Sequence, residues 1–203
     1  MKEAFIFDGL RTPFGRYGGA LSSVRPDDLL VNLIGTLVER NSFARDQFED
    51  VIVGCTNQAG EDCRNVARRA GLIAGLPVEV AGMTVNRLCA SGLAAVVDAS
   101  RAVASGQGDL FIAGGVESMS RAPFVLGKSD RAYGRQVNMF DSTLGSRFSN
   151  PSVTERYGDH AMVETAEEVA KDLDVGRAEC DLFAAESQRK FSEAKSKCFY
   201  SGE

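Results

Sequence analysis

The first 116 residues alternate short apolar runs with longer segments that carry apolar residues at helical spacing. The apolar runs have the length of strands and end at glycine or turn residues; they cover 4–8, 51–53, 81–85 and 109–113. One helix-like segment begins at Pro26, and two others cover 63–74 and 90–105. Strands that alternate with helices form βαβ units, so residues 1–116 are predicted to be an α/β domain with a mostly parallel sheet flanked by helices.

The pattern changes after residue 116. Gly, Ser, Arg, Asn and Pro are scattered as far as residue 162, with weak periodicity, and a long irregular segment in a compact domain commonly serves a function. Two helices are predicted beyond it, one opened by a capping box at 165–168 and one over 177–198. Residues 117–203 are therefore expected to form a second region. Nothing in the last four residues closes a fold, so we expect part of the protein to be absent from this sequence.

Composition and charge argue against several classes of partner. Hydrophobic residues make up 44% of the chain, charged residues 25%, and the net charge is −5, which offers no basis for binding nucleic acid or an anionic membrane. Apolar runs stay short of the roughly 20 residues that a membrane span needs. The first residues lack the pattern of a signal peptide, so the expected location is cytoplasmic.

The chain has five cysteines, an odd number at irregular spacing and without a Cys-x-x-Cys pair: Cys55, Cys63, Cys89, Cys180 and Cys198. No metal site is therefore predicted. Most cysteines in a reducing compartment are small buried residues, and Cys180 and Cys198 fit this role because they fall on an apolar helical stripe.

Cys89 differs because it lies between a predicted strand and the amino end of a predicted helix. The unpaired N–H groups and partial positive charge of a helix start favour a thiolate, which is the nucleophilic form, and can also stabilise an oxyanion. Gly92 keeps the first turn of that helix slim. Two alternatives stay open: a small residue where strand and helix pack closely, and Cys63 as a rival that also opens a predicted helix.

Four segments, in family order, resemble those of thiolases: Arg11–Gly15, the reactive-cysteine segment Asn86–Leu93, Gly114–Pro123 and Thr165–Glu167. Within that family the chain is similar to the 3-oxoadipyl-CoA thiolases at 16–25, 57–62 and 65–68. The resemblance implies the amino-terminal half of a thiolase-like fold, with part of the loop domain in 117–203. It further implies a homo-oligomer.

The resemblance also implies a chemistry. Cys89 would attack the keto carbon of a 3-oxoacyl-CoA, hold the acyl group and pass it to a second CoA; for 3-oxoadipyl-CoA the products are succinyl-CoA and acetyl-CoA. Coenzyme A would be a substrate, with no bound cofactor. The family's Gly-His-Pro and Cys-Gly-Gly segments do not occur in this sequence, so the chain is expected to be inactive alone.

One segment departs from the family. Short-chain thiolases of the acetoacetyl type carry His-Met-Gly where this chain has Ala161-Met162-Val163. Met162 matches and is predicted to contact substrate, whereas His160 is displaced by one residue and fits a solvated loop position. Basic residues nearby could face a CoA phosphate, although each fits a solvated surface equally: Arg121, Lys128, Arg131, Arg135 and Arg147.

Other functions stay open at this point. The enzyme alternatives are an acetoacetyl-type acetyl-CoA acetyltransferase and a ketoacyl synthase. A papain-like protease is poorly supported, because the sequence has neither its cysteine motif nor a histidine far downstream. The remaining alternative is a non-catalytic module that binds CoA or lipid or serves assembly; trapping an acyl group on Cys89 would separate it from the enzymes.

Overall fold

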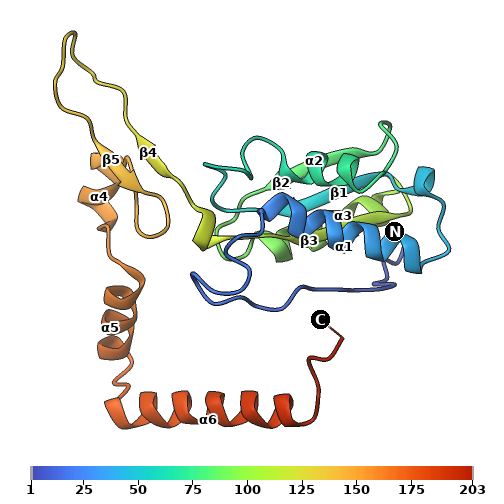
Figure 1. Cartoon of the computed structure of the whole chain (residues 1–203). Coiled ribbons are helices and arrows are strands. Elements are labelled where there is room, and N and C mark those ends of the chain that lie inside the picture. Colours follow the sequence, from blue (N-terminus) through green and yellow to red (C-terminus); the bar gives the residue numbers. More distant parts are fainter. Residues whose placement is uncertain (1, 203) are drawn as a thin grey trace. The chain divides into compact units, whose positions relative to one another are not determined.

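The computed structural model describes residues 2–202, which divide into two compact units after Thr143. The first holds the sheet and its helices, and the second holds three further helices (Figure 1). The boundary predicted after residue 116 concerns the start of a loop domain and stays a prediction.

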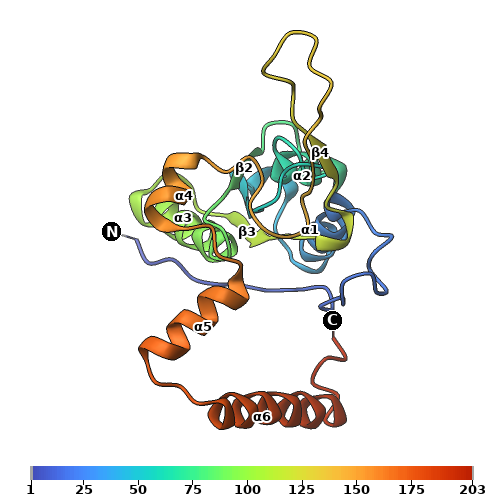
Figure 2. The same cartoon turned by 90° about the vertical axis from the view of Figure 1, so that its left-hand side faces the viewer.

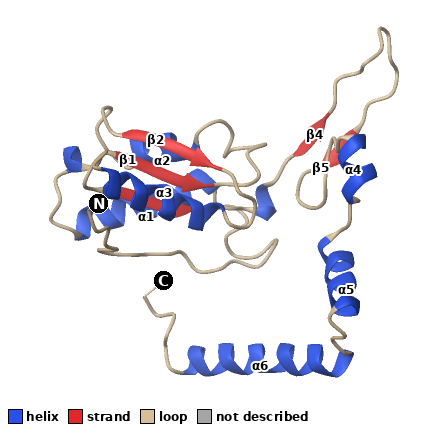
Figure 3. Cartoon of the chain, turned by 180° about the vertical axis from the view of Figure 1, so that it is seen from behind, coloured by secondary structure: helices blue, strands red, loops and turns tan. Residues whose placement is uncertain are grey.

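The first unit is built on a parallel three-stranded sheet. Its strands are β1 (Asp50–Gly54), β2 (Ala81–Val85) and β3 (Phe111–Gly115), in the order β2-β1-β3. Figure 3 shows β2 beside β1. In this register Gly54 lies opposite both Val85 and Gly115. The three strands therefore end level, and the loops that follow them start side by side. The predicted α/β fold with a mostly parallel sheet is confirmed.

Helices cover both faces of this sheet. α1 (Pro26–Arg40) and α2 (Val66–Ile73) lie on one side, and α3 (Ser91–Ser105) lies on the other (Figure 2). The main core lies on the side of α1 and α2, where alternate residues of β1 meet the buried faces of the two helices. Its most buried members are Ile34, Val51, Val53, Val66, Ala67 and Ala70.

α3 is less covered than expected. The sequence predicts packing on nearly all sides, but Ser91 and Ala95 are its only buried residues, and Leu93 is 68% exposed. One face rests on β1 and β3, and the other is uncovered by the described residues. By length and composition alone, the segment Leu88–Ser105 is long and apolar enough to cross a membrane. Core helices made of small apolar residues meet the same criteria.

The segment 4–8 is not a strand, which corrects the prediction. Phe5 and Ile6 are more than 80% exposed. Phe7 sets its ring edge-on to Phe43 at 5.0 Å, and Asp8 accepts hydrogen bonds from Arg40. A strand needs a hydrogen-bonding neighbour, and among the described residues none lies beside this segment, so its apolar sequence remains extended without a ladder.

A short hairpin, not predicted from sequence, follows the sheet. The 3₁₀ turn η1 (Arg45–Gln47) precedes β1, and the 3₁₀ turn η2 (Met119–Arg121) follows β3. Beyond η2, β4 (Phe124–Leu126) pairs antiparallel with β5 (Met139–Asp141) (Figure 1). Each strand is only three residues long, which explains why period-two alternation did not reveal them.

The second unit contains α4 (Pro151–Tyr157), α5 (Met162–Asp172) and α6 (Arg177–Ser196). α5 begins earlier than predicted, since the Glu164 carboxylate accepts from the Ala161 backbone N–H at 2.7 Å and caps it there. The packing role predicted for Cys180 and Cys198 is wrong for the described chain, because both are exposed. Phe191, on the same stripe of α6, packs against Tyr200 with ring centroids 5.6 Å apart.

Candidate active site

Cys89 lies in the turn between β2 and α3, as predicted, and the helix begins two residues after it, one residue later than expected. It is exposed. Residues 86–90 join the carboxyl end of a strand to the amino end of a helix, so the thiol stands at the edge of the sheet where loops meet. Its role as nucleophile stays a prediction.

The turn holds a strained backbone. Leu88, directly before Cys89, has φ of +50°, a left-handed conformation that costs a residue with a side chain about 1–2 kcal/mol. Several hydrogen bonds hold it there. Its N–H donates to Asn86 Oδ1 at 2.9 Å, and its carbonyl accepts from Ser91 N at 3.0 Å and Ser91 Oγ at 2.6 Å. The position of Cys89 therefore depends on neighbours that fix Leu88.

Ser91 is the centre of these bonds. It is only 4% exposed, and its hydroxyl accepts from the Arg87 N–H at 2.8 Å while donating to the Leu88 carbonyl. One side chain thus satisfies a donor and an acceptor of the turn. Sequence reasoning did not single out Ser91; a serine in the first turn of a helix was the available signal.

The loop after β1 reaches the same turn. Thr56 Oγ1 donates to the Leu88 carbonyl at 3.1 Å, and Asn86 Nδ2 donates to the Thr56 carbonyl at 3.0 Å. Thr56 therefore contacts the turn on both sides of Arg87. Sequence reasoning missed Thr56 as well, although a polar residue directly after a strand is a usable signal.

Cys55 is unsuited to nucleophilic chemistry. It is 1% exposed, and burial, together with the nearby carboxylates of Glu117 and Asp62, raises the pKa of its thiol to about 12. At neutral pH it stays protonated. Cys63, the rival named from the sequence, is half-buried in the loop before α2 and does not open that helix, which begins at Val66.

Cys55, Asp62 and Glu117 bring metal-binding atom types within 4.8 Å of one another. Each carboxylate already accepts backbone N–H bonds, Asp62 from Gly60 at 3.0 Å and Glu117 from Thr56 at 2.8 Å. Those bonds account for both acidic groups, and we assign no ion to the cluster.

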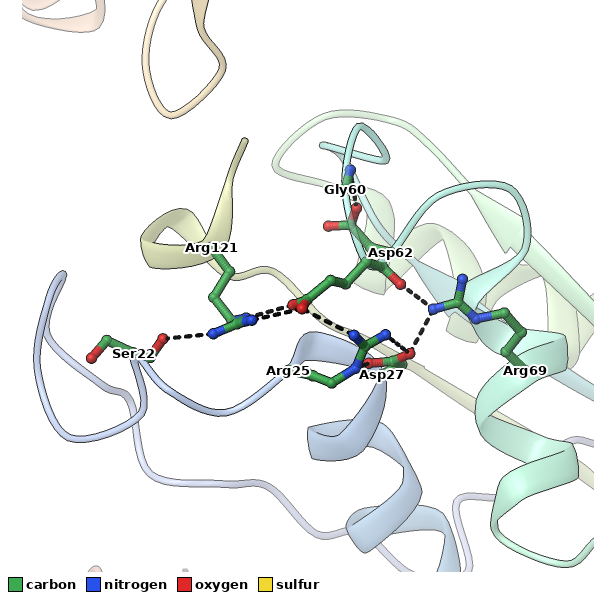
Figure 4. A network of polar contacts seen from close by, with 8 residues as sticks. Ser22, Arg25, Asp27, Gly60, Asp62, Arg69 and Arg121 are labelled. Carbon is green, nitrogen blue, oxygen red and sulfur yellow. Dashed lines mark hydrogen bonds and ion pairs between the residues drawn. The ribbon is translucent and has the colours of Figure 1, made fainter. Parts of the chain in front are cut away.

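An ion-pair network anchors the loop that leads from Thr56 to α2 (Figure 4). Asp27, 3% exposed at the start of α1, accepts from Arg25 at 2.8 Å and Arg69 at 2.6 Å. Burial acts to raise the pKa of the Asp27 carboxyl, but the two guanidinium groups outweigh it and leave the pKa below its usual range. Glu61 accepts from Arg121 at 2.6 Å, so the Arg121 side chain is engaged in this network.

Met162 and His160 belong to the second unit. Met162 is the first residue of α5 and is 79% exposed. His160 is exposed, and its neighbour Asp159 accepts from Ser149 Oγ at 3.0 Å. The predicted contact of Met162 with substrate stays a prediction.

Comparison with known proteins matches this arrangement to one family. Residues 4–203 fit the model of the thiolase N-terminal domain. The chain is 57% identical over 197 residues to the 3-oxoadipyl-CoA/3-oxo-5,6-dehydrosuberyl-CoA thiolase of Escherichia coli K12, covering 97% of this chain and 49% of that protein. It is 52% identical over 204 residues to the beta-ketoadipyl-CoA thiolase of Pseudomonas putida, covering 100% and 51%. The chain thus spans about half the length of the curated relatives it matches.

Solved structures agree. The acetyl-CoA acetyltransferase of Bacillus anthracis aligns with a TM-score of 0.81 and 29% identity, covering 95% of this chain and 47% of that one. Human mitochondrial 3-ketoacyl-CoA thiolase in complex with CoA aligns with a TM-score of 0.82 and 30% identity, covering 95% and 48%. Since the family model accounts for nearly every residue and the fold matches half of each enzyme, the chain belongs to the thiolase family and represents its amino-terminal half.

Proposed function

We propose that this chain supplies the nucleophile, Cys89, of a thiolase that cleaves 3-oxoadipyl-CoA with CoA. One observation carries the proposal: Cys89 is an exposed thiol at the amino end of α3, held in a strained and multiply bonded turn. The relatives indicate the substrate, because they are 3-oxoadipyl-CoA or beta-ketoadipyl-CoA thiolases at 52–57% identity.

The proposed reaction has two steps. The Cys89 thiolate attacks the C3 carbonyl carbon, the C2–C3 bond breaks, and the electron pair leaves on C2 as the enolate of acetyl-CoA, which takes a proton. The succinyl group stays on Cys89 as a thioester. A CoA thiolate then attacks that carbonyl and releases succinyl-CoA and the free Cys89 thiolate. The partial positive charge at the start of α3 would stabilise the negative oxygen that forms in each step.

The chain alone is proposed to be inactive. Deprotonation of Cys89 and of the incoming CoA, and protonation of the enolate, each need an acid or base. The single histidine, His160, is exposed in a loop of the second unit. The 203 residues span about half of the relatives, so we place the proton-transfer groups in the remainder.

An assay of 3-oxoadipyl-CoA thiolysis tests the proposal. The reaction is monitored as the loss of substrate absorbance in the presence of CoA and Mg²⁺. The 203-residue chain is expected to give no turnover. The same chain joined to the carboxyl-terminal half of the P. putida relative is expected to turn over, and Cys89→Ser is expected to abolish that activity. Full activity of the joined Cys89→Ser protein would refute the role of Cys89. Turnover of acetoacetyl-CoA, with none of 3-oxoadipyl-CoA, would instead support the acetyl-CoA acetyltransferase alternative.

A further inference from the structure

We infer that Glu117 and Thr56 are positioning residues for the nucleophile: Glu117 fixes Thr56, and Thr56 fixes the turn that carries Cys89. The inference rests on the proposed role of Cys89. It concerns the carboxyl ends of three neighbouring strands, because Thr56 follows β1, the Cys89 turn follows β2, and Glu117 follows β3.

Glu117 binds the backbone after β1 with both carboxylate oxygens. Oε2 accepts from Thr56 N at 2.8 Å and Oε1 accepts from Asn57 N at 3.1 Å. Hydrogen bonds to an ionised acceptor are about twice as strong as neutral ones, and two successive N–H groups on one carboxylate fix the orientation of the intervening peptide. Glu117 therefore determines how Thr56 faces the turn.

Thr56 passes this constraint to the turn through the two bonds described above, from its hydroxyl to Leu88 and from Asn86 to its carbonyl. Ser91 also binds the Leu88 carbonyl, but Ser91 lies in the first turn of α3 and moves with the segment that it holds. Thr56 follows directly after the end of β1, the middle strand of the sheet. Its bond therefore fixes the turn relative to the sheet.

The strain at Leu88 makes this anchoring consequential. A left-handed Leu88 relaxes when its carbonyl loses a fixed donor, and the residue that moves with it is Cys89. Neither positioning residue contributes to the core: Glu117 is exposed and Thr56 is half-buried, whereas the core lies against α1 and α2. Their contacts act on the edge of the sheet where the thiol stands.

The test measures iodoacetamide alkylation of Cys89 in the 203-residue chain, with exposed Cys180 as a reference in the same sample. Peptide mass mapping gives the ratio of the two rates. Thr56→Val removes the hydroxyl donor at nearly constant volume, and Thr56→Ser keeps that donor as the matched control. Glu117→Gln keeps the shape but replaces one acceptor oxygen with an NH₂ group. Circular dichroism and thermal unfolding check that each variant is folded.

Thr56→Val is expected to lower the Cys89-to-Cys180 ratio by about threefold to tenfold, the range that follows from losing one hydrogen bond. Thr56→Ser should stay close to the parent. Glu117→Gln is expected to lower the ratio too. Removal of a negative charge by itself favours a nearby thiolate and would raise the ratio. A decrease would therefore show that the turn has moved. In the double variant Thr56→Val with Glu117→Gln, the Cys89-to-Cys180 ratio should fall by less than the product of the two single decreases, because Glu117 acts on the turn through Thr56.

A ratio that is unchanged or higher in Thr56→Val, in a folded protein, overturns the inference, as does an equal fall in Thr56→Ser. This result is distinct from a failure of the proposed function. If Cys89 of the parent chain reacts no faster than Cys180, the nucleophile assignment is weakened, while the comparison of each variant with the parent still decides whether Thr56 and Glu117 position the turn.

Discussion

Gly54 packs backbone to backbone against Ser91. A Cβ on Gly54 would overlap the carbonyl group of Ser91 and would lie 2.5 Å from the backbone nitrogen of Gly92. Gly115 at the end of β3 is also close, since its Cβ would lie 3.3 Å from the Gly92 Cα. The first turn of α3 thus rests directly on two strand ends, which places the preceding Cys89 at the sheet edge.

Gly54→Ala is expected to push α3 off β1 and to destabilise the chain by about 1–3 kcal/mol, the usual effect of overpacking. Gly92→Ala is the matched control, because a Cβ there meets nothing nearer than the Gly114 carbonyl at 4.0 Å. Alanine in a helix is favoured over glycine by about 0.5–1 kcal/mol, so this control should keep or raise stability. Urea unfolding measures both; equal destabilisation would contradict the close approach at Gly54.

Asp27→Asn is expected to destabilise the chain by about 1.5–3 kcal/mol, because a nearly buried acceptor of charged hydrogen bonds from Arg25 and Arg69 is lost. Glu186→Gln, which removes an exposed ion pair with Arg189 on α6, should leave stability nearly unchanged, because solvent screens such a pair. Since the pKa of Asp27 is lowered in the fold, its contribution is present at neutral pH and is lost as the pH falls below the usual Asp range. Thermal unfolding at pH 7 and pH 3 measures it; a difference between Asp27→Asn and parent that grows toward acid would be inconsistent with this account.

Asp50→Asn is expected to stabilise the chain at neutral pH. Asp50 Oδ1 is buried without a hydrogen-bond partner among the described residues, and burial raises the pKa of its carboxyl. A raised folded pKa means that the protonated form is favoured in the fold, so stability falls as the pH rises above the usual Asp range. The gain from Asp50→Asn should therefore be present at pH 7 and shrink toward pH 4, as read by thermal unfolding. A loss of stability at pH 7 would show that the carboxylate has a stabilising role.

Local signals predicted most of the fold. β2 was predicted to the residue and α3 to within one residue, while β1 is one residue longer at each end than predicted. β3 lies two residues later than predicted, because Gly114 and Gly115 continue the strand instead of ending it. Glycine or proline marks several of the other ends. Gly106, for example, closes α3 with φ of +75°, a conformation that favours glycine. The prediction of a strand at 4–8 was wrong because a strand needs a hydrogen-bonding neighbour in space, and an apolar run in the sequence does not reveal whether that neighbour exists.

The same distinction applies to the site. Cys89 was singled out because its features are local, a cysteine between a strand and a helix start. Thr56 and Glu117 were not, because Thr56 meets the turn, and Glu117 meets Thr56, only through the register of the parallel strands. The three loops come together because the strands end level, at Gly54, Val85 and Gly115.

Competitive alkylation of all five cysteines tests the central claim, that this fold presents Cys89 as the reactive thiol. The folded chain is treated with limiting iodoacetamide near neutral pH, and labelled peptides are mapped by mass spectrometry. Cys89 is expected to label first, with a modest rate advantage, since a helix terminus alone contributes only about 0.3–1 kcal/mol to a nearby charge. Exposed Cys180 and Cys198 should follow, and Cys55, with a pKa of about 12 and 1% exposure, should label last and only after unfolding. Labelling of Cys63 or Cys180 ahead of Cys89 in the folded chain would contradict the claim.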